Sequence, residues 1–271
     1  KMSKLDIYCL TGKNLELFKH FPNHIIPLGL GYNSFPKNFL VEKNGENILK
    51  LNKYFAEMTG IYWVYKNKLN NYKENDWIGF CHYRRLWLDD IYFKKHNNKS
   101  NIYSKLLNKE NNIFSNNQTI MLQPTILKNE NIYEHFENNH GKSIMDASFK
   151  LMDNKMSNSF KNYLEKKEFC IGNMFITKPE ILIKYCEFVF QFLDKLLDFS
   201  LKNNLCVNNN IKLPGYFIER FTSFWFHEYT KVGYLSYIQL GKYFTNNITN
   251  KFYNSLKTPY SFMLCPTILD I

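Results

Sequence analysis

The sequence predicts a single α/β domain with a mostly parallel central sheet and helices on both faces. Its 271 residues are 45% hydrophobic and 17% aromatic, which is enough apolar material for one packed core. Residues 77–83 are aromatic, β-branched or small, and only His82 among them is readily ionisable. That composition is typical of a strand buried on both faces of a parallel sheet. The chain also begins with a strand, a small-residue turn and a helix, the order from which α/β domains are built.

In the first half of the chain, short apolar runs predict strands and apolar residues at helical spacing predict helices. The predicted elements are a strand at 5–11, a short helix at 14–20, a strand at 25–30, a loop to residue 45, a helix from about 52 to 69 and the strand at 77–83. Residues 94–118 contain eight Asn among 25 and show no periodicity. This stretch is predicted to be a long loop, either a mobile lid or a floppy insertion.

In the second half of the chain, long helices follow short strands. The predicted elements are a strand at 119–123, helices at 132–140, 142–152 and 159–167, a strand at 168–177, helices at 179–203 and 217–231, and a closing strand at 234–240. Gly172 and Asn173 lie at the centre of the strand 168–177. A glycine inside a strand often marks the close approach of a ligand or of another backbone, and a buried Asn needs hydrogen-bond partners.

Charge and cysteine content restrict the partners and the compartment. Lys and Arg number 35 against 24 Asp and Glu, so the formal net charge is +11 and anionic partners are favoured. The basic residues form no stripe, and we expect no nucleic-acid partner. The six cysteines include no Cys-x-x-Cys pair, which predicts neither a zinc site nor disulfides and favours the reducing cytoplasm. No signal peptide and no apolar run near the ~18 residues of a spanning helix are recognised, so membrane contact is expected to be peripheral.

The stretch from Asp76 to Trp87 ends an apolar run in a compact cationic cluster. His82, Arg84 and Arg85 follow the buried strand, and ligands of open α/β sheets bind beyond the carboxyl ends of the strands. Two guanidinium groups beside an imidazole there suit an anion such as a phosphate. The alternative is structural: the two arginines pair with Asp89 and Asp90, and His82 is a satisfied core histidine.

Two motifs resemble a bacterial family known as a domain of unknown function in surface-polysaccharide loci. One is Cys81-His82-Tyr83-Arg84-Arg85. The other is an upstream helix pattern whose matching residues are Asn47-Ile48, Asn52, Tyr54, Glu57, Thr59, Tyr62-Trp63 and Lys66-Asn67. The family includes the galactofuranosyltransferase domain of a bifunctional O-antigen polymerase. The Ser-Glu that follows Asn-Ile in the family is Leu49-Lys50 here, a charge reversal near the expected donor site.

The resemblance implies a glycosyltransferase-A-like domain over residues 2–271, with extra helices on the acceptor side. Residues 2–125 would form the nucleotide-binding half and residues 126–271 the acceptor and catalytic half. The expected reaction is inverting transfer of a sugar such as galactofuranose from a UDP-sugar to a growing capsular or lipopolysaccharide glycan at the inner face of the membrane. Expected partners are the UDP-sugar, a glycan or lipid-linked acceptor, and other enzymes or domains of polysaccharide assembly. The alternative is a non-catalytic glycan- or nucleotide-binding module.

Residue types and the resemblance together predict the site. Glu219 is the expected catalytic base, with Arg220 beside it, because a carboxylate at a helix start after Pro214-Gly215 can face a cleft. Asp76 and Glu57 are reserve candidates, and Glu219 can instead simply pair with Arg220 or interact with the helix dipole. The expected nucleotide-sugar-binding residues are Thr11, Lys13, Asn47, Glu57, His82, Arg84, Arg85 and Asn173.

The chain has no Asp-x-Asp sequence, with which many glycosyltransferase-A enzymes hold a divalent metal. We therefore expect side-chain cations to stabilise the departing diphosphate and no metal cofactor to be required. Asp89 and Asp90 are the fallback ligands for Mn²⁺ or Mg²⁺.

Overall fold

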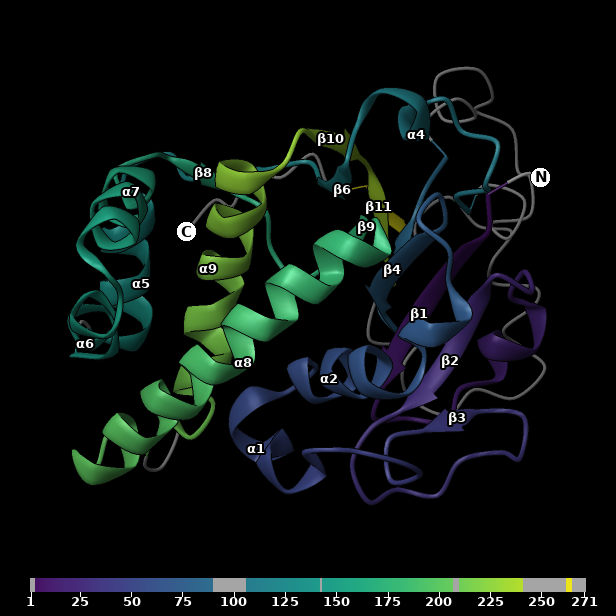
Figure 1. Ribbon diagram of the computed structural model, residues 1–271, viewed down its shortest axis with the longest axis horizontal. Helices are drawn as coiled ribbons and strands as arrows, with labels where there is room; N and C mark the ends of the chain where they lie inside the picture. The colour runs from purple at the N-terminus through teal and green to yellow at the C-terminus, as the bar shows by residue number, and fades with distance from the viewer. Residues whose placement is uncertain (1–2, 90–105, 142, 207–209, 241–261, 265–271) are drawn as a thin grey trace.

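The structure is a computed structural model that describes residues 3–89, 106–141, 143–206, 210–240 and 262–264. It is a mixed α/β fold with a mostly parallel central sheet, as predicted. Figure 1 shows the sheet on one side of the molecule, the long helices α8 and α9 beside it, and α5, α6 and α7 farther away.

Seven strands of the described chain form the main path of the sheet. Their spatial order is β10 (Val232–Leu235), β6 (Thr119–Leu122), β9 (Phe175–Thr177), β4 (Trp77–His82), β1 (Leu5–Thr11), β2 (Ile25–Gly29) and β3 (Leu40–Val41). Neighbours along this path are parallel except where β9 pairs with β4 and β6. The carboxyl ends of β1 to β4 therefore meet at one edge, where Leu10 pairs with His82 and Thr11 with Gly29.

An antiparallel extension continues from the end of β4. After a turn at residues 83–84, β5 (Arg85–Trp87) pairs back with β4 and also with β11 (Tyr237–Leu240), which in turn pairs with β12 (Phe262–Leu264). A separate two-stranded sheet joins β7 (Thr125–Ile126) to β8 (Glu168–Phe169).

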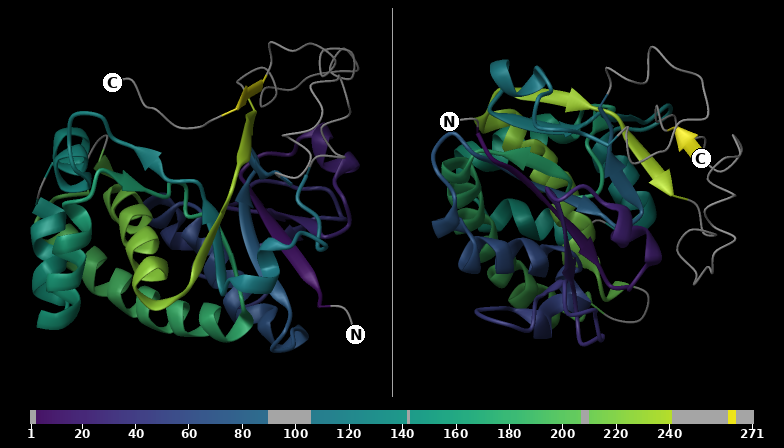
Figure 2. Two further views of the ribbon diagram at one scale, coloured as in Figure 1. Left: turned by 90° about the horizontal axis from the view of Figure 1, so that it is seen from above. Right: turned by 90° about the vertical axis from the view of Figure 1, so that its right-hand side faces the viewer.

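The two faces of the sheet have different covers (Figure 2). On one face Tyr8, Leu10 and Phe80 belong to a large core with α2 (Met58–Asn67), α8 (Pro179–Lys202) and α9 (Leu213–Tyr229). On the other face Leu5, Ile7 and Cys9 belong to a smaller core that includes Phe18 of the 3-10 helix η1 (Glu16–His20) and Phe114 of α4 (Ile113–Asn116). Successive side chains of β1 point to opposite faces of the sheet, so this strand contributes residues to both cores.

Three further helices extend the first core beyond α9. They are α5 (Ile132–His140), α6 (Ser143–Leu151) and α7 (Asn154–Leu164). Asn131 and Glu134 close a capping box at the start of α5, and Asp153 caps α7 by accepting from the backbone N–H of Met156. Phe160 of α7 packs against three phenylalanines of α9, with ring centroids 5.0–5.8 Å apart.

The helix predicted at 52–69 is in fact two helices, α1 (Asn52–Phe55) and α2. Ala56 between them has a φ of 49°, a left-handed conformation that a continuous helix excludes. The side chain of Asn52 donates to the backbone carbonyl of Ala56 and to the hydroxyl of Thr59. It thereby competes with the helical hydrogen bonds, which an apolar periodicity alone does not reveal.

Other boundaries were also wrong. The strand predicted at 168–177 divides into β8 and β9, and the one at 234–240 divides into β10 and β11. The short strand β3 lies in the predicted loop before residue 45, and α7 and α9 begin at Asn154 and Leu213, earlier than predicted. Residues 94–105 of the predicted long loop lie outside the described residues. Among the described residues, no helix is long and apolar enough to span a membrane.

Candidate active site

The cations predicted after β4 lie on a tight turn. Arg84 is exposed at the tip of this turn, and Arg85, half-buried, already belongs to β5, where it pairs with His82 at the carboxyl end of β4. Neither arginine has an ion-pair partner within the described ranges. Asp89, the predicted structural partner, is buried and accepts from the amides of Asn108 and Asn111 at 2.8 Å each. Asp90 lies outside the described residues.

His82 is a neutral member of this group. Burial, followed by the positive charges of Arg85, Arg84 and Lys212, lowers the pKa of His82 from 6.5 to about 3. Its Nδ1 atom is buried without a hydrogen-bond partner in the described part of the chain. The imidazole is therefore neutral at pH 7 and lacks the positive charge that the sequence predicted for this group.

Lys212 was not predicted. It is exposed, directly precedes α9, and its charge reaches His82. The first turn of α9 packs against the end of α1, where a Cβ on Gly215 would lie 3.0 Å from the carbonyl oxygen of Tyr54. Nothing in the local sequence links Lys212 to β4, because only the tertiary fold brings them together.

The turn between β8 and β9 explains why Gly172 and Asn173 interrupt the predicted strand. Their φ angles are 86° and 47°. A Cβ on Gly172 would lie 2.8 Å from Nη1 of Arg85, and the backbone N–H of Gly172 donates to Oε1 of Glu219. The absent side chain at Gly172 thus lets the guanidinium of Arg85 lie against the turn.

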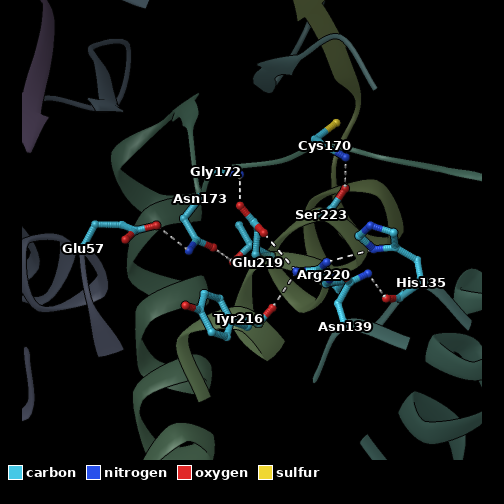
Figure 3. Close-up of polar contacts among 11 residues, drawn as sticks. Glu57, His135, Asn139, Cys170, Gly172, Asn173, Tyr216, Glu219, Arg220 and Ser223 are labelled. Carbon is cyan, nitrogen blue, oxygen red and sulfur yellow. Dashed lines mark hydrogen bonds and ion pairs between the residues drawn. The ribbon is translucent and has the colours of Figure 1, made fainter. Parts of the chain in front are cut away.

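Asn173 connects α2 to α9 (Figure 3). Its side chain is buried, its Nδ2 donates to Oε1 of Glu57 at 3.0 Å, and its Oδ1 accepts from the hydroxyl of Thr222 at 3.0 Å. The hydroxyls of Thr222 and Tyr185 are 2.6 Å apart. The hydroxyl of Thr222 therefore fixes the orientation of the amide, so that its N–H₂ faces Glu57.

Glu57 directly follows Ala56 and precedes the first residue of α2. Burial raises the pKa of Glu57 above 4.5, and the charge of Glu219 adds to this effect. Hydrogen bonds from its own backbone N–H and from Asn173, together with the charge of Arg85, act in the opposite direction. This carboxyl group thus lies within electrostatic reach of both Arg85 and Glu219.

Glu219 and Arg220 form an ion pair on α9, 3.0 Å from Oε2 to Nη1. Arg220 is 3% exposed, and it also donates to the carbonyl of Tyr216 and approaches Nδ1 of His135 at 3.0 Å. Its guanidinium lies over the rings of two buried phenylalanines, Phe136 and Phe169. Arg220 is therefore enclosed within the protein, where it positions Glu219.

The remaining predicted residues lie elsewhere or act locally. Thr11, at the end of β1, accepts from the backbone N–H of Lys13 at 2.9 Å and donates to its carbonyl at 2.6 Å, so the two share one turn. The side chain of Asn47 bonds to Gly45 O and to the N–H of Leu49 within its own loop. Asp76 accepts from the backbones of Lys4 and Lys73 at the amino end of β4, opposite to His82 and away from the predicted cations.

Across the described ranges, no group of three or more His, Cys, Asp or Glu side chains could hold a metal ion. The metal requirement remains a prediction, because Asp90 of the fallback pair lies outside those ranges.

The fold and the site define an α/β protein that presents polar and cationic groups beyond the carboxyl ends of parallel strands, where such sheets bind ligands. The chain belongs to the family described as domain of unknown function (DUF4422), whose model matches residues 6–231. A comparison with curated proteins gave no match.

Among solved structures, the chain is similar to the apo structure of the bifunctional glycosyltransferase WbbM, with a TM-score of 0.64 and 22% sequence identity. The similarity covers 87% of this chain but only 45% of the WbbM chain. It confirms the predicted α/β fold. The family match confirms the resemblance at the level of the family.

Proposed function

We propose that this protein is a glycosyltransferase that moves a sugar, such as galactofuranose, from a UDP-sugar to a growing capsular or lipopolysaccharide glycan. The observation that carries the proposal is a group of cations at the carboxyl edge of the sheet, Arg84, Arg85 and Lys212, that have no ion-pair partner in the described part of the chain. Arg85 lies within electrostatic reach of the carboxyl group of Glu57. Membership of the family and the fold shared with WbbM support the reaction class.

The cations suit the leaving group of this reaction. As the bond to the sugar breaks, negative charge accumulates on the diphosphate, and preorganised positive groups stabilise it most strongly. Guanidinium groups bind phosphate oxygens in a bidentate manner, and Lys212 adds a third charge from another element. The neutral imidazole of His82 adds no further charge to this group.

The nucleoside would lie over the ends of β1 and β2. The side chain of Asn33 donates to the carbonyl of Gly12 at 2.8 Å and joins the loops that follow these two strands. Beside it, Tyr32 is 75% exposed, an unusual state for a large aromatic side chain. A uracil ring stacked on Tyr32 would place the ribose and phosphates near Thr11 and Lys13 and direct them toward Arg84.

The cations would take the role that a divalent metal has in many related enzymes, so turnover is expected to persist in EDTA. Stereochemical inversion and a lipid-linked acceptor are further parts of the proposal. The net charge of +11 suits an anionic membrane surface at the cytoplasmic side.

The test is calorimetric titration with UDP, in EDTA and again with Mn²⁺. Binding in EDTA that Arg84→Ala or Lys212→Ala weakens about tenfold or more is expected, since each removes a charge-assisted contact worth roughly 1.5–3 kcal/mol. Lys195→Ala, an exposed lysine on α8, is the matched control and should bind like the wild type. Absence of UDP binding under both conditions would contradict the proposal. Binding without UDP release from UDP-sugars would favour the non-catalytic module.

A further inference from the structure

Two carboxyl groups, those of Glu57 and Glu219, lie near Arg85, and their hydrogen bonds differ. Glu57 comes from the start of α2 and Glu219 from the second turn of α9. The turn at Gly172-Asn173 joins them, since Glu219 accepts from the backbone of Gly172 and Glu57 from the side chain of Asn173. A base that deprotonates an acceptor hydroxyl needs an oxygen lone pair that no protein group occupies.

Both oxygens of Glu219 are engaged. Oε1 accepts from Gly172, and Oε2 accepts from Arg220 at 3.0 Å. Arg220 is itself held by the carbonyl of Tyr216 and by His135, so the guanidinium cannot turn away without breaking several contacts. The ion pair with Arg220 therefore occupies the oxygen that does not bond to Gly172. The contacts of Glu219 fix the backbone of the turn.

Glu57 has the opposite arrangement. Only its Oε1 accepts a hydrogen bond from another residue, Asn173, and no other residue in the described part of the chain hydrogen-bonds to Oε2. The left-handed Ala56 turns the chain so that Glu57 precedes α2, and Asn52 and Thr59 stabilise this turn. The backbone N–H of Glu57 and the side chain of Asn173 thus hold the carboxyl group, and no cation in the described part of the chain forms an ion pair with it.

The charges around Glu57 support the same division. Burial raises the pKa of Glu57 and Glu219 raises it further, whereas Arg85 and the amide of Asn173 lower it. The phenol of Tyr185, whose own pKa is raised by burial, also feels the charge of Glu57. A carboxyl pKa shifted upward, toward the working pH, improves a general base.

Resting on the proposed glycosyl transfer, we infer that Glu57 is the catalytic base and that Glu219 is a positioning residue. The acceptor hydroxyl oxygen forms the new bond to the anomeric carbon and its proton passes to Oε2 of Glu57. The bond between that carbon and the diphosphate oxygen breaks, and its electron pair leaves with UDP, whose charge Arg84, Arg85 and Lys212 offset. The products are the glycoside, UDP and protonated Glu57, which returns its proton to water.

Azide rescue tests this assignment, because the azide anion attacks without losing a proton. Wild-type enzyme, Glu57→Ala, Glu57→Gln and Glu219→Ala are compared for UDP release from UDP-galactofuranose, with octyl galactoside as the acceptor and with azide added. We expect Glu57→Ala to lose turnover roughly 100-fold or more and azide to restore UDP release with formation of a galactofuranosyl azide. Azide should not rescue Glu219→Ala, since that change disturbs the turn and not the proton transfer.

Glu57→Gln keeps an oxygen that can accept from Asn173, so this variant should fold even if Glu57→Ala does not. It should bind UDP within about threefold of wild type, lose turnover, and lose the acid limb of the pH profile of kcat/KM. Glu228→Gln, an exposed carboxylate near the end of α9, is the matched control. Normal turnover of Glu57→Gln, or azide rescue of Glu219→Ala alone, would overturn the assignment while leaving the proposed function intact. If the wild-type protein neither binds UDP nor releases UDP from UDP-galactofuranose, both this assignment and the proposed function are overturned.

Discussion

Replacing Gly172 by alanine tests whether the turn at residues 172–173 controls the position of Arg85. Gly172 has a φ of 86°, and a Cβ there would lie 2.8 Å from Nη1 of Arg85. The contacted atom is the end of a flexible side chain, so the clash is relieved when Arg85 moves. The backbone strain remains, because L-residues rarely adopt this φ.

Two magnitudes follow. The left-handed conformation costs roughly 1–2 kcal/mol of folding free energy, which for a chain of this size corresponds to a Tm lower by about 2–5 °C. Displacement of Arg85 removes one charge-assisted contact with a diphosphate, roughly 1.5 kcal/mol or more, and weakens UDP binding about tenfold.

The assay combines thermal unfolding with calorimetric UDP titration. Gly141→Ala is the matched control, because Gly141 also has a positive φ, 79°, while a Cβ there would meet nothing within 4 Å. The control should lose stability and keep its affinity for UDP. If Gly172→Ala binds UDP as tightly as Gly141→Ala does, Arg85 does not contact the nucleotide and the reasoning fails.

Three other predictions concern separate parts of the site. Tyr32→Ala should weaken UDP binding roughly tenfold but leave competition by inorganic pyrophosphate unchanged, and an equal loss for both ligands would contradict base stacking. His82→Gln should reduce the loss of stability in acid. The pKa of His82 is about 3 in the folded state and about 6.5 in the unfolded state, so the unfolded state binds more protons between these two values. The free energy of unfolding of the wild type therefore falls as the pH drops from about 7 toward 3. Urea unfolding at several pH values measures this, and parallel curves for both proteins would refute it. Arg220→Met should lower the free energy of unfolding by about 2–4 kcal/mol, because it leaves Glu219 partly buried without its ion pair. The side chain of Glu219 is 22% exposed, so the effect should be smaller than for a fully buried pair. An unchanged urea midpoint would show that the pair contributes nothing.

The sequence predicted the elements whose burial pattern is local. The apolar run at β4 and the stripes of α8 and α9 indicate strand and helix because each pattern repeats within a few residues. The break at Ala56 escaped prediction because a side-chain hydrogen bond from Asn52 causes it. Gly172 and Asn173 are unusual residues for the centre of a strand, and the sequence shows this. It does not show that a turn divides the strand there, because that division depends on contacts with Arg85 and Glu219.

The site was predictable to a similar extent. Glu57, Asn173 and Glu219 were all selected from the sequence, and the structure brings them together. Their division of roles depends on which oxygen each donor reaches, which no sequence pattern encodes. Lys212 and Tyr32 were missed because an exposed lysine or tyrosine in a loop is common, and only the neighbouring strand ends make these two informative.

The pairing of β5 with β11 has a practical consequence for where the domain can be cut. The family match ends at residue 231, yet Arg85 pairs with Gln239 and Trp87 with Tyr237 across that boundary. A recombinant fragment trimmed to the family limits would keep the signature sequence but lose β11, the strand that pairs with Arg85 and Trp87. Expression boundaries for this chain should therefore be chosen from the strand pairing, and a fragment that stops at residue 231 is a poor reagent for testing nucleotide binding.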